Sequence, residues 1–235
     1  MYDWQGDYII ARLLAQDKKI ISDMVHYKLH YFDVRGLGEM IRMILIYNNE
    51  PFEEHRFPVD SEEWHAYKPS TPFGKVPLLE IDDKILSQSF AIARYLARKY
   101  GLAGKDDFES AYLDSIADAQ KDFYQEVKPY YLVCGYGGKY GGDKDKEKLY
   151  NELFLPVAQR HLPKIEKLLK ESKSGFYAQS GLSWVDFYMA EQTHTFSAFA
   201  PETFKQYPEL LKHKERVYSL PQLRNYIQSR KNTPT

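Results

Sequence analysis

The spacing of apolar residues in the first hundred positions predicts a mixture of strands and helices. Apolar and polar residues alternate over 25–32, with the period of two typical of a strand, and 52–57 predicts a second short strand. Apolar residues recur at helical spacing over 38–48 and 88–100. Two short apolar runs within 76–86 flank an Asp-Asp pair and predict a hairpin. The predicted order is therefore βαβ followed by ββα, which is an α/β arrangement.

The second half of the chain has helical periodicity and no convincing strand pattern. Ile116, Ala119, Phe123 and Val127 mark one face of a long helix that begins at about Phe108. An all-helical domain is therefore expected after the α/β domain. A glycine-rich break is predicted near 135–142. Four more helices are predicted after it, near 147–171, 184–199, 208–217 and 221–228.

The 235 residues are enough for one large domain or two small ones. Asp106 and Asp107 lie where the pattern changes, so we expect an α/β domain over 25–103 and an all-helical domain over 106–228. Residues 1–24 are predicted to be an N-terminal extension. Their apolar run is short and follows acidic residues, so it does not match a secretory signal as it stands. A short amphipathic helix and the remnant of a cleaved signal both stay open.

Composition narrows the class of protein. With 32 Lys and Arg against 33 Asp and Glu, the net charge of −1 gives no overall electrostatic footprint for nucleic acid or an anionic membrane. No apolar run approaches the roughly 18 residues that a membrane-spanning helix needs. The single cysteine, Cys134, excludes an intrachain disulfide and a cysteine-rich zinc site. We expect a cytoplasmic protein, and secretion stays open because of the extension.

Three motifs, in order along the chain, resemble those of glutathione transferases. The first motif, Tyr27–Phe32 with Arg35, Gly36 and Glu39, resembles the first strand and turn of the family. The second, 72–79 with 86–89 and 91–96, resembles its glutathione-binding core. The third, 181–187, resembles a helix start of its second domain and contains the capping box Ser183-x-x-Asp186. The resemblance covers about 25–228 and is greatest to the sigma class, which contains haematopoietic prostaglandin D synthase and many nematode and insect enzymes. It implies a thioredoxin-like N-terminal domain, an all-helical C-terminal domain and a homodimer.

The resemblance also implies which residues bind glutathione. The family pairs the cysteinyl amide with the residue before a cis-proline, and Val76-Pro77 matches that dipeptide. Gln88 and Ser89 begin a helix, whose unpaired N–H groups suit the γ-glutamyl carboxylate. The implied glycyl-end residues are Trp64, Lys68 and Lys75, and the implied contribution of the other subunit is Asp122. Each of these could instead be an ordinary cap, core or surface residue.

Tyr31 is the predicted catalytic residue. A free thiol has a pKa near 8.5, so only about 7% is thiolate at pH 7.4. A phenol that donates a hydrogen bond to the sulfur favours the charged form. Lowering the pKa to about 6.5 takes roughly 2.7 kcal/mol and raises the thiolate fraction to about 90%. The thiolate is then the nucleophile.

One departure from the sigma pattern concerns the turn after Tyr31. The class often has a second arginine two residues after the position of Arg35, and this chain has Leu37 there. Arg35 could serve a structural pairing instead. Which groups besides Tyr31 stabilise the thiolate therefore stays open. The predicted binding of glutathione does not depend on this point.

The second substrate is expected between the domains, with Tyr124, Lys128 and the Tyr130-Tyr131 region near it. The glycine-rich stretch 135–142 is not a phosphate-binding loop, because no strand precedes it and no Ser or Thr follows its lysine. We expect it to be a flexible loop near the pocket mouth.

The expected activity is conjugation of glutathione to hydrophobic electrophiles, together with a possible isomerisation of prostaglandin H2 to D2. The alternative is a non-catalytic ligand-binding or structural protein of the same fold. We expect no metal, because Lys121 interrupts the acidic cluster of Asp118 and Asp122.

Overall fold

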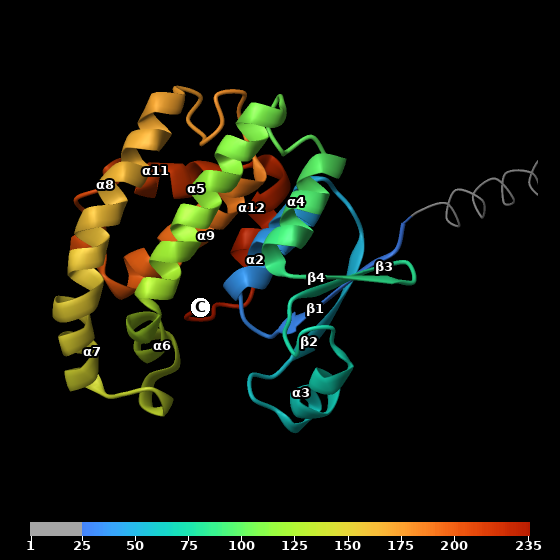
Figure 1. Cartoon of the computed structure of the whole chain (residues 1–235), viewed down its shortest axis with the longest axis horizontal. Coiled ribbons are helices and arrows are strands. Elements are labelled where there is room, and N and C mark those ends of the chain that lie inside the picture. The colour runs from blue at the N-terminus through green and yellow to red at the C-terminus, as the bar shows by residue number, and fades with distance from the viewer. Residues whose placement is uncertain (1–24) are drawn as a thin grey trace, which may run out of the picture.

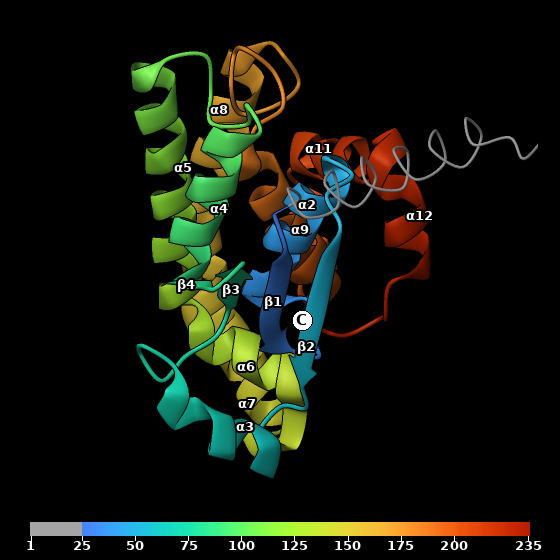
Figure 2. The ribbon, with the colours of Figure 1, turned by 90° about the vertical axis from the view of Figure 1, so that its right-hand side faces the viewer.

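In the computed structural model, which describes residues 25–235, four strands form one mixed sheet in the order β2-β1-β3-β4 (Figures 1 and 2). β1 and β2 are parallel, so a crossover is required between them, and helix α2 (Glu39–Tyr47) supplies it. The other two pairs are antiparallel. The predicted βαβ-ββα order is confirmed. The strands are β1 (Tyr27–Phe32), β2 (Phe52–Phe57), β3 (Leu78–Ile81) and β4 (Lys84–Ser87).

The alternation along β1 assigns its side chains to two faces of the sheet. Tyr27, Leu29 and Tyr31 are buried on the face that also packs against α2. His30 and Phe32 lie on the opposite face, where their rings meet Tyr67 and Trp64 of α3 (Glu62–Tyr67). Tyr31 and Trp64 therefore approach the end of β1 from opposite sides of the sheet.

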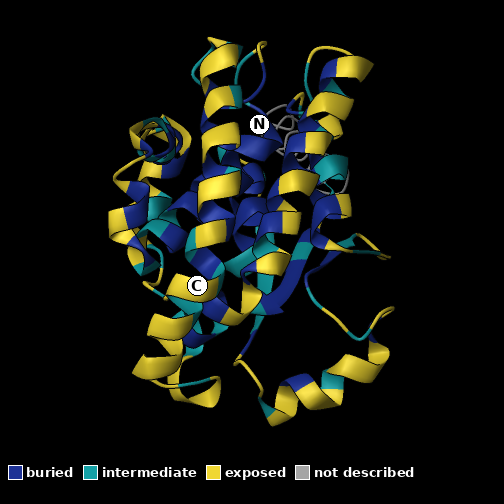
Figure 3. Cartoon of the chain, turned by 60° about the vertical axis from the view of Figure 1, so that its left-hand side comes forward, coloured by how far each residue is buried: buried dark blue, intermediate teal, exposed yellow. Residues whose placement is uncertain are grey.

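The rest of the described chain is helical and surrounds α9, which is buried at 12 of its 16 positions. Figure 3 shows exposed residues on the outward faces of the helices and buried residues between them. The core therefore lies between α9 and the helices around it, and it continues to the buried face of β1. The helices that follow β4 are α4 (Ser89–Lys99), α5 (Asp107–Glu126), α6 (Lys128–Tyr136), α7 (Asp143–Leu149), α8 (Leu155–Ser172), α9 (Trp184–Phe199), α10 (Pro201–Phe204), α11 (Pro208–Tyr218) and α12 (Pro221–Ser229).

Two details of the helical prediction need correction. In α5, Ile116 and Phe123 are buried as predicted, but Ala119 is exposed, and Ala117 and Gln120 are buried in its place. The buried face follows steps of three and four residues, and Ala119 falls outside it. The predicted glycine-rich break at 135–142 is shorter, since α6 continues to residue 136 and a single 3₁₀ turn, Gly137–Lys139, leads toward α7. The helix predicted at 147–171 is α7, a π-helical turn over Tyr150–Phe154, and α8.

The predicted capping box at the start of α9 is confirmed and is part of a larger anchor. The Asp186 carboxylate accepts the Ser183 N–H and hydroxyl, each at 2.8 Å. It also accepts the Tyr177 N–H at 2.9 Å and lies 2.8 Å from Nε2 of His213. Asp186 is fully buried, so these partners supply the polar contacts that water would otherwise make.

The two structural parts meet along α2, which packs against α9 and α12. The backbone N–H of Trp184 also donates to the carbonyl of Leu102 at 3.0 Å, just before the chain enters α5. Within the described range, no helix is long and apolar enough to cross a membrane. The extension predicted at 1–24 lies outside the described residues.

Candidate functional site

Two adjoining pockets lie where the sheet meets the helical part, and they share Leu37 and Tyr124. The first, about 320 Å³, is called the tyrosine pocket because five tyrosines line it. The second, about 510 Å³, is called the cis-proline pocket because Pro77 lines it. The tyrosine pocket is lined chiefly by Tyr31, Trp64, Tyr124, Tyr131, Tyr136, Tyr140, Lys139, Asp60 and Gln192. The cis-proline pocket is lined chiefly by Lys75, Val76, Gln88, Ser89, Arg94, Lys121 and Tyr188.

The Tyr31 hydroxyl is positioned as a hydrogen-bond donor toward the tyrosine pocket. Its oxygen accepts the backbone N–H of Leu37 at 2.9 Å, which leaves the phenolic proton free to be donated elsewhere. Burial raises the pKa of Tyr31 to about 12, although the Leu37 N–H acts in the opposite direction. The phenol is therefore protonated at neutral pH, as a donor to a thiolate must be.

Two glycines allow the Tyr31 ring to lie against the turn that follows β1. A Cβ atom on Gly36 would lie 2.6 Å from the Tyr31 hydroxyl oxygen, and one on Gly38 would lie 2.5 Å from Cδ1 of the ring. Gly36 also has a φ of +41°, a conformation that L-residues with side chains rarely adopt. Sequence reasoning used Gly36 only as part of a motif and missed Gly38. The Gly-x-Gly spacing after the tyrosine was the available signal.

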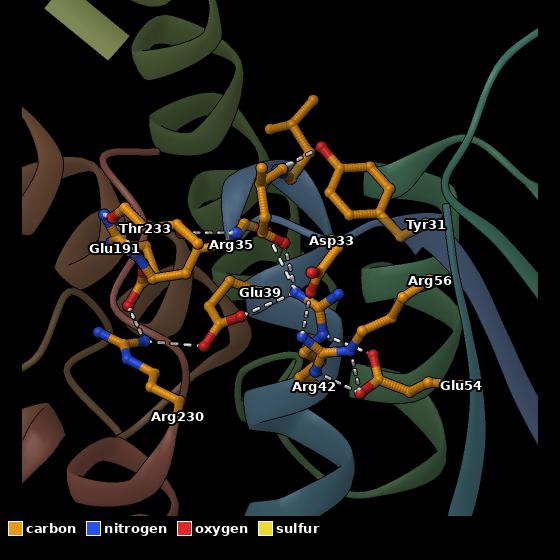
Figure 4. A network of polar contacts seen from close by, with 12 residues as sticks. Tyr31, Asp33, Arg35, Glu39, Arg42, Glu54, Arg56, Glu191, Arg230 and Thr233 are labelled. Carbon is orange, nitrogen blue, oxygen red and sulfur yellow. Dashed lines mark hydrogen bonds and ion pairs between the residues drawn. The ribbon is translucent and has the colours of Figure 1, made fainter. Parts of the chain in front are cut away.

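Arg35 makes a structural pairing, one of the two roles left open for it. Its Nη1 donates to a Glu191 carboxylate oxygen at 2.8 Å, and its Nη2 donates to the carbonyl of Thr233 at 2.9 Å (Figure 4). Both arginine and glutamate are buried, so they are shielded from solvent. At the position of the second family arginine, Leu37 supplies a backbone N–H to Tyr31 and an apolar side chain to both pockets.

The cis-proline pocket brings together four residues implied by the resemblance: Lys75, Val76, Gln88 and Ser89. The Val76–Pro77 peptide bond is cis, as predicted. Ser89 begins α4, whose preceding residue Gln88 makes no side-chain cap, so the first N–H groups of the helix are available to a ligand. Gln88 has a φ of +74°, an uncommon conformation for a residue with a side chain.

The charges around the cis-proline pocket favour an anionic ligand. Lys75, Arg94 and Lys121 line it, and none of its lining residues is a carboxylate. Asp114 and Asp118 lie behind Arg94, at 2.9 and 3.2 Å from its nitrogens. Together with the N-terminus of α4, Lys75, Arg94 and Lys121 make the cis-proline pocket the more electropositive of the two pockets.

The other implied residues lie outside the cis-proline pocket. Trp64 lines the tyrosine pocket and packs its indole against Phe32 and Phe57, with ring centroids 5.1 and 5.6 Å apart. Lys68 lines neither pocket but lies beside the loop at Gly74. The predicted pair Trp64 and Lys68 is therefore not brought together in one pocket.

Two more predicted residues line neither pocket. Asp122 and Lys128 are exposed on the surface of the described chain. Of the predicted second-substrate residues, Tyr124 lines both pockets and Tyr131 lines the tyrosine pocket, whereas Tyr130 donates to the carbonyl of Phe199 at 2.9 Å.

Sequence reasoning missed several lining residues of the tyrosine pocket. Tyr136 and Tyr140 come from the glycine-rich region, and Gln192 comes from the middle of α9. Lys139 forms an ion pair with Asp60, and both residues line this pocket. Two signals were available in the sequence, the expectation that 135–142 lies near the pocket mouth and the 20 tyrosines of the whole chain, but neither identified individual positions.

Comparison with known proteins gives the family. A model of the glutathione S-transferase N-terminal domain matches residues 27–98, and a model of the C-terminal domain matches 136–230. The chain is 42% identical over 212 residues to a protein of Caenorhabditis elegans named probable glutathione S-transferase 7, covering 90% of this chain and 100% of that one. The chain belongs to the glutathione S-transferase family, and the predicted fold class is confirmed.

Further relatives refine this placement. A hematopoietic prostaglandin D synthase of Gallus gallus is 35% identical over 210 residues, covering 89% of this chain and 99% of that protein. A solved Nu-class glutathione S-transferase of Haemonchus contortus is 41% identical, with a TM-score of 0.79 over 90% of this chain and 100% of its own. A monomeric enzyme of Necator americanus, Na-GST-3, is 44% identical, with a TM-score of 0.81 over 89% of this chain and 99% of its own. These matches do not single out the sigma class or a dimer.

Proposed function

We propose that the protein is a glutathione transferase that activates the glutathione thiol with Tyr31 and conjugates it to hydrophobic electrophiles. The observation that carries this proposal is the hydrogen bonding of the Tyr31 hydroxyl. Its oxygen accepts the backbone N–H of Leu37, a residue that lines both pockets, and the phenolic proton remains available to a thiolate in the tyrosine pocket. The family assignment supports the same chemistry.

The cis-proline pocket suits the peptide part of glutathione. Extended backbone at Val76 can pair with the cysteinyl amide, and the N-terminus of α4 at Gln88 and Ser89 can receive the γ-glutamyl carboxylate. Lys75 lines the same pocket and can meet the glycyl carboxylate. This arrangement directs the cysteine side chain of glutathione toward Tyr31.

Tyr31 acts by stabilising the thiolate. The thiol loses its proton to solvent, and the phenol then donates its own hydrogen bond to the sulfur. The thiolate attacks the electrophilic carbon of the second substrate, and the leaving group departs with the electron pair of its bond. Apolar and aromatic side chains of the tyrosine pocket bind the second substrate beside the sulfur.

Finer parts of the assignment are proposals of the same kind. We propose domains at 25–103 and 106–228, the sigma class, and a cytoplasmic homodimer in which Asp122 of one subunit reaches the glutathione of the other. The exposed position of Asp122 on α5 is compatible with such a contact. Trp64 and Lys68 are proposed near the glycyl end, where Trp64 lies at the boundary of the tyrosine pocket and Lys68 lies beside the loop that precedes Val76.

A second proposed activity is the isomerisation of prostaglandin H2 to prostaglandin D2. The aromatic lining of the tyrosine pocket and the prostaglandin D synthase relative favour it. The thiolate attacks one endoperoxide oxygen, the O–O bond breaks, and the other oxygen takes up a proton. Loss of a proton from the carbon that bears the S–O oxygen forms the ketone and expels the thiolate. Incubation with the endoperoxide and glutathione, followed by separation of the D, E and F products, tests this activity against an enzyme-free control.

Retention on immobilised glutathione, combined with turnover of a chlorinated dinitrobenzene, tests the main proposal. A transferase is retained and turns over, whereas retention without turnover indicates the alternative, a non-catalytic ligand-binding member of the same fold. Tyr31→Phe is expected to keep glutathione binding while the pKa of the bound thiol rises toward about 8.5. Ultraviolet titration of the thiolate measures this pKa, and an unchanged value would contradict the role of Tyr31.

A further inference from the structure

A buried polar network surrounds the turn that follows β1 (Figure 4). Arg35, Arg42 and Arg230 alternate in it with Glu39, Glu54 and Glu191. Its members come from β2, from the turn after β1, from α2, from α9 and from the C-terminal segment. The proposed chemistry of the site uses none of these side chains directly, so the network requires a separate explanation.

Arg42 is the member that contacts the turn beside Tyr31. Its Nη1 donates to the carbonyls of Val34 at 2.9 Å and Arg35 at 3.3 Å. These carbonyls belong to the same turn that presents the Leu37 N–H to the Tyr31 hydroxyl. Arg42 therefore reaches the turn at two points, within three residues of the amide that orients the phenol.

Arg42 also lies against the tyrosine itself. Its guanidinium carbon is 5.8 Å from the centroid of the Tyr31 ring, within the range of a cation–π contact. Gly36 and Gly38 approach the ring closely along its Cδ1–Cε1 edge, which leaves little room for the ring to move on that side. One side chain thus contacts both groups whose relative position sets the Leu37-to-Tyr31 hydrogen bond.

Two carboxylates hold the Arg42 guanidinium in place. Glu39 lies 2.9 Å from Nη1, and Glu54 lies 2.6 Å from Nε. Arg42 is fully buried, and the two carboxylates, led by Glu39, raise its pKa against the effect of burial, so it stays charged. Because carboxylates pair with it on two sides, the planar Arg42 guanidinium is held in one well-defined orientation.

We propose that Arg42 is a positioning residue for Tyr31. Arg42 holds the turn at Val34 and Arg35 so that the Leu37 N–H meets the phenolic oxygen, and the phenolic proton then stays directed at the thiol. This proposal rests on the proposed transferase function. Arg42 does not touch the substrate in this role, because it acts through the turn and the ring. A purely structural arginine would stabilise the fold without affecting the ionisation of the bound thiol.

Arg230 provides a matched control. Its side chain is only 8% exposed and also pairs with two carboxylates, Glu39 at 2.8 Å and Glu191 at 2.6 Å, but it makes no hydrogen bond to the turn. Arg42→Lys and Arg230→Lys therefore both disturb the same buried network, in which each arginine pairs with Glu39. Only the first is expected to change the chemistry of the site.

The experiment measures the pKa of glutathione bound to each variant by ultraviolet absorbance of the thiolate, together with kcat and KM. In Arg42→Lys we expect the thiol pKa to rise by about one unit, kcat/KM below that pKa to fall roughly tenfold, and KM for glutathione to change by less than about twofold. In Arg230→Lys we expect thermal stability to fall while the thiol pKa stays at the wild-type value.

A second variant keeps the test decisive if Arg42→Lys does not fold. Glu54→Gln removes one anchor of Arg42 at a partly exposed carboxylate, and we expect a smaller rise of the thiol pKa in the same direction. An unchanged thiol pKa in the folded Arg42 or Glu54 variant, or an equal rise in Arg230→Lys, would overturn the proposal alone. A wild-type complex whose glutathione titrates as it does in free solution would overturn the transferase function, and this proposal with it.

Discussion

Gly38→Ala is predicted to displace the Tyr31 ring while the backbone remains able to adopt its native conformation. Gly38 has φ −74° and ψ −26°, which alanine adopts readily, and replacing glycine with alanine in a helical turn is by itself stabilising by about 0.5–1 kcal/mol. The new Cβ would lie 2.5, 2.8 and 3.1 Å from three carbons of the Tyr31 ring. The two shortest of these distances are to Cδ1 and Cγ at the base of the ring, so no flexible end of a side chain can give way.

The overpacking costs about 1–3 kcal/mol, which exceeds the backbone gain. We expect a net loss of about 1–2 kcal/mol and, for a chain of this size, a fall in Tm of roughly 2–8 °C. Because the hydroxyl moves with the ring, its hydrogen bond to the Leu37 N–H is weakened. The pKa of the bound thiol should therefore rise and kcat should fall more than the affinity for glutathione.

Thermal unfolding followed by circular dichroism, and thiolate titration of the glutathione complex, measure the two effects. Gly138→Ala is the matched control, since no atom lies within 4 Å of the position that its Cβ would take. It should keep the wild-type thiol pKa and turnover, and its Tm should stay the same or rise slightly through the backbone gain alone. A Gly38→Ala protein with wild-type Tm and thiol pKa would refute the argument that this glycine is required by the ring.

Three more predictions follow from other parts of the molecule. Burial lowers the pKa of His161 to about 4, so as the pH falls this histidine takes up a proton in the unfolded chain before it does so in the folded protein. His161 should therefore reduce the free energy of unfolding by about 1–3 kcal/mol between pH 6.5 and pH 4. His161→Gln should flatten that part of the stability profile measured by urea unfolding. Asp186→Asn should lower stability by about 3–5 kcal/mol by breaking a buried pair with His213, and a calorimetric Tm close to wild type would contradict this. Removal of residues 1–24 should leave turnover and the oligomeric state unchanged, which sedimentation and a conjugation assay check.

The sequence predicted the local structure of this protein well, because local structure depends on residues that are near one another in the chain. The alternation at Tyr27, Leu29 and Tyr31 correctly indicated a strand, and these three residues share a buried face of the sheet. The capping box of Ser183 and Asp186 correctly located the start of α9. A family motif, itself a short local pattern, correctly indicated the cis bond at Val76–Pro77. The choice of Tyr31 among the many tyrosines rests on another such motif and stays a prediction.

The structure decided which distant residues meet. Arg35 pairs with Glu191, 156 positions away, and with the carbonyl of Thr233, 198 positions away, and no periodicity relates such separations. The sequence suggested Lys128 as a cation near the second substrate, whereas Lys139 lines the tyrosine pocket. Local patterns record which face of an element is apolar. The partners of a buried charge, and the side chains around a pocket, depend on how the elements pack together, so they follow only from the tertiary structure.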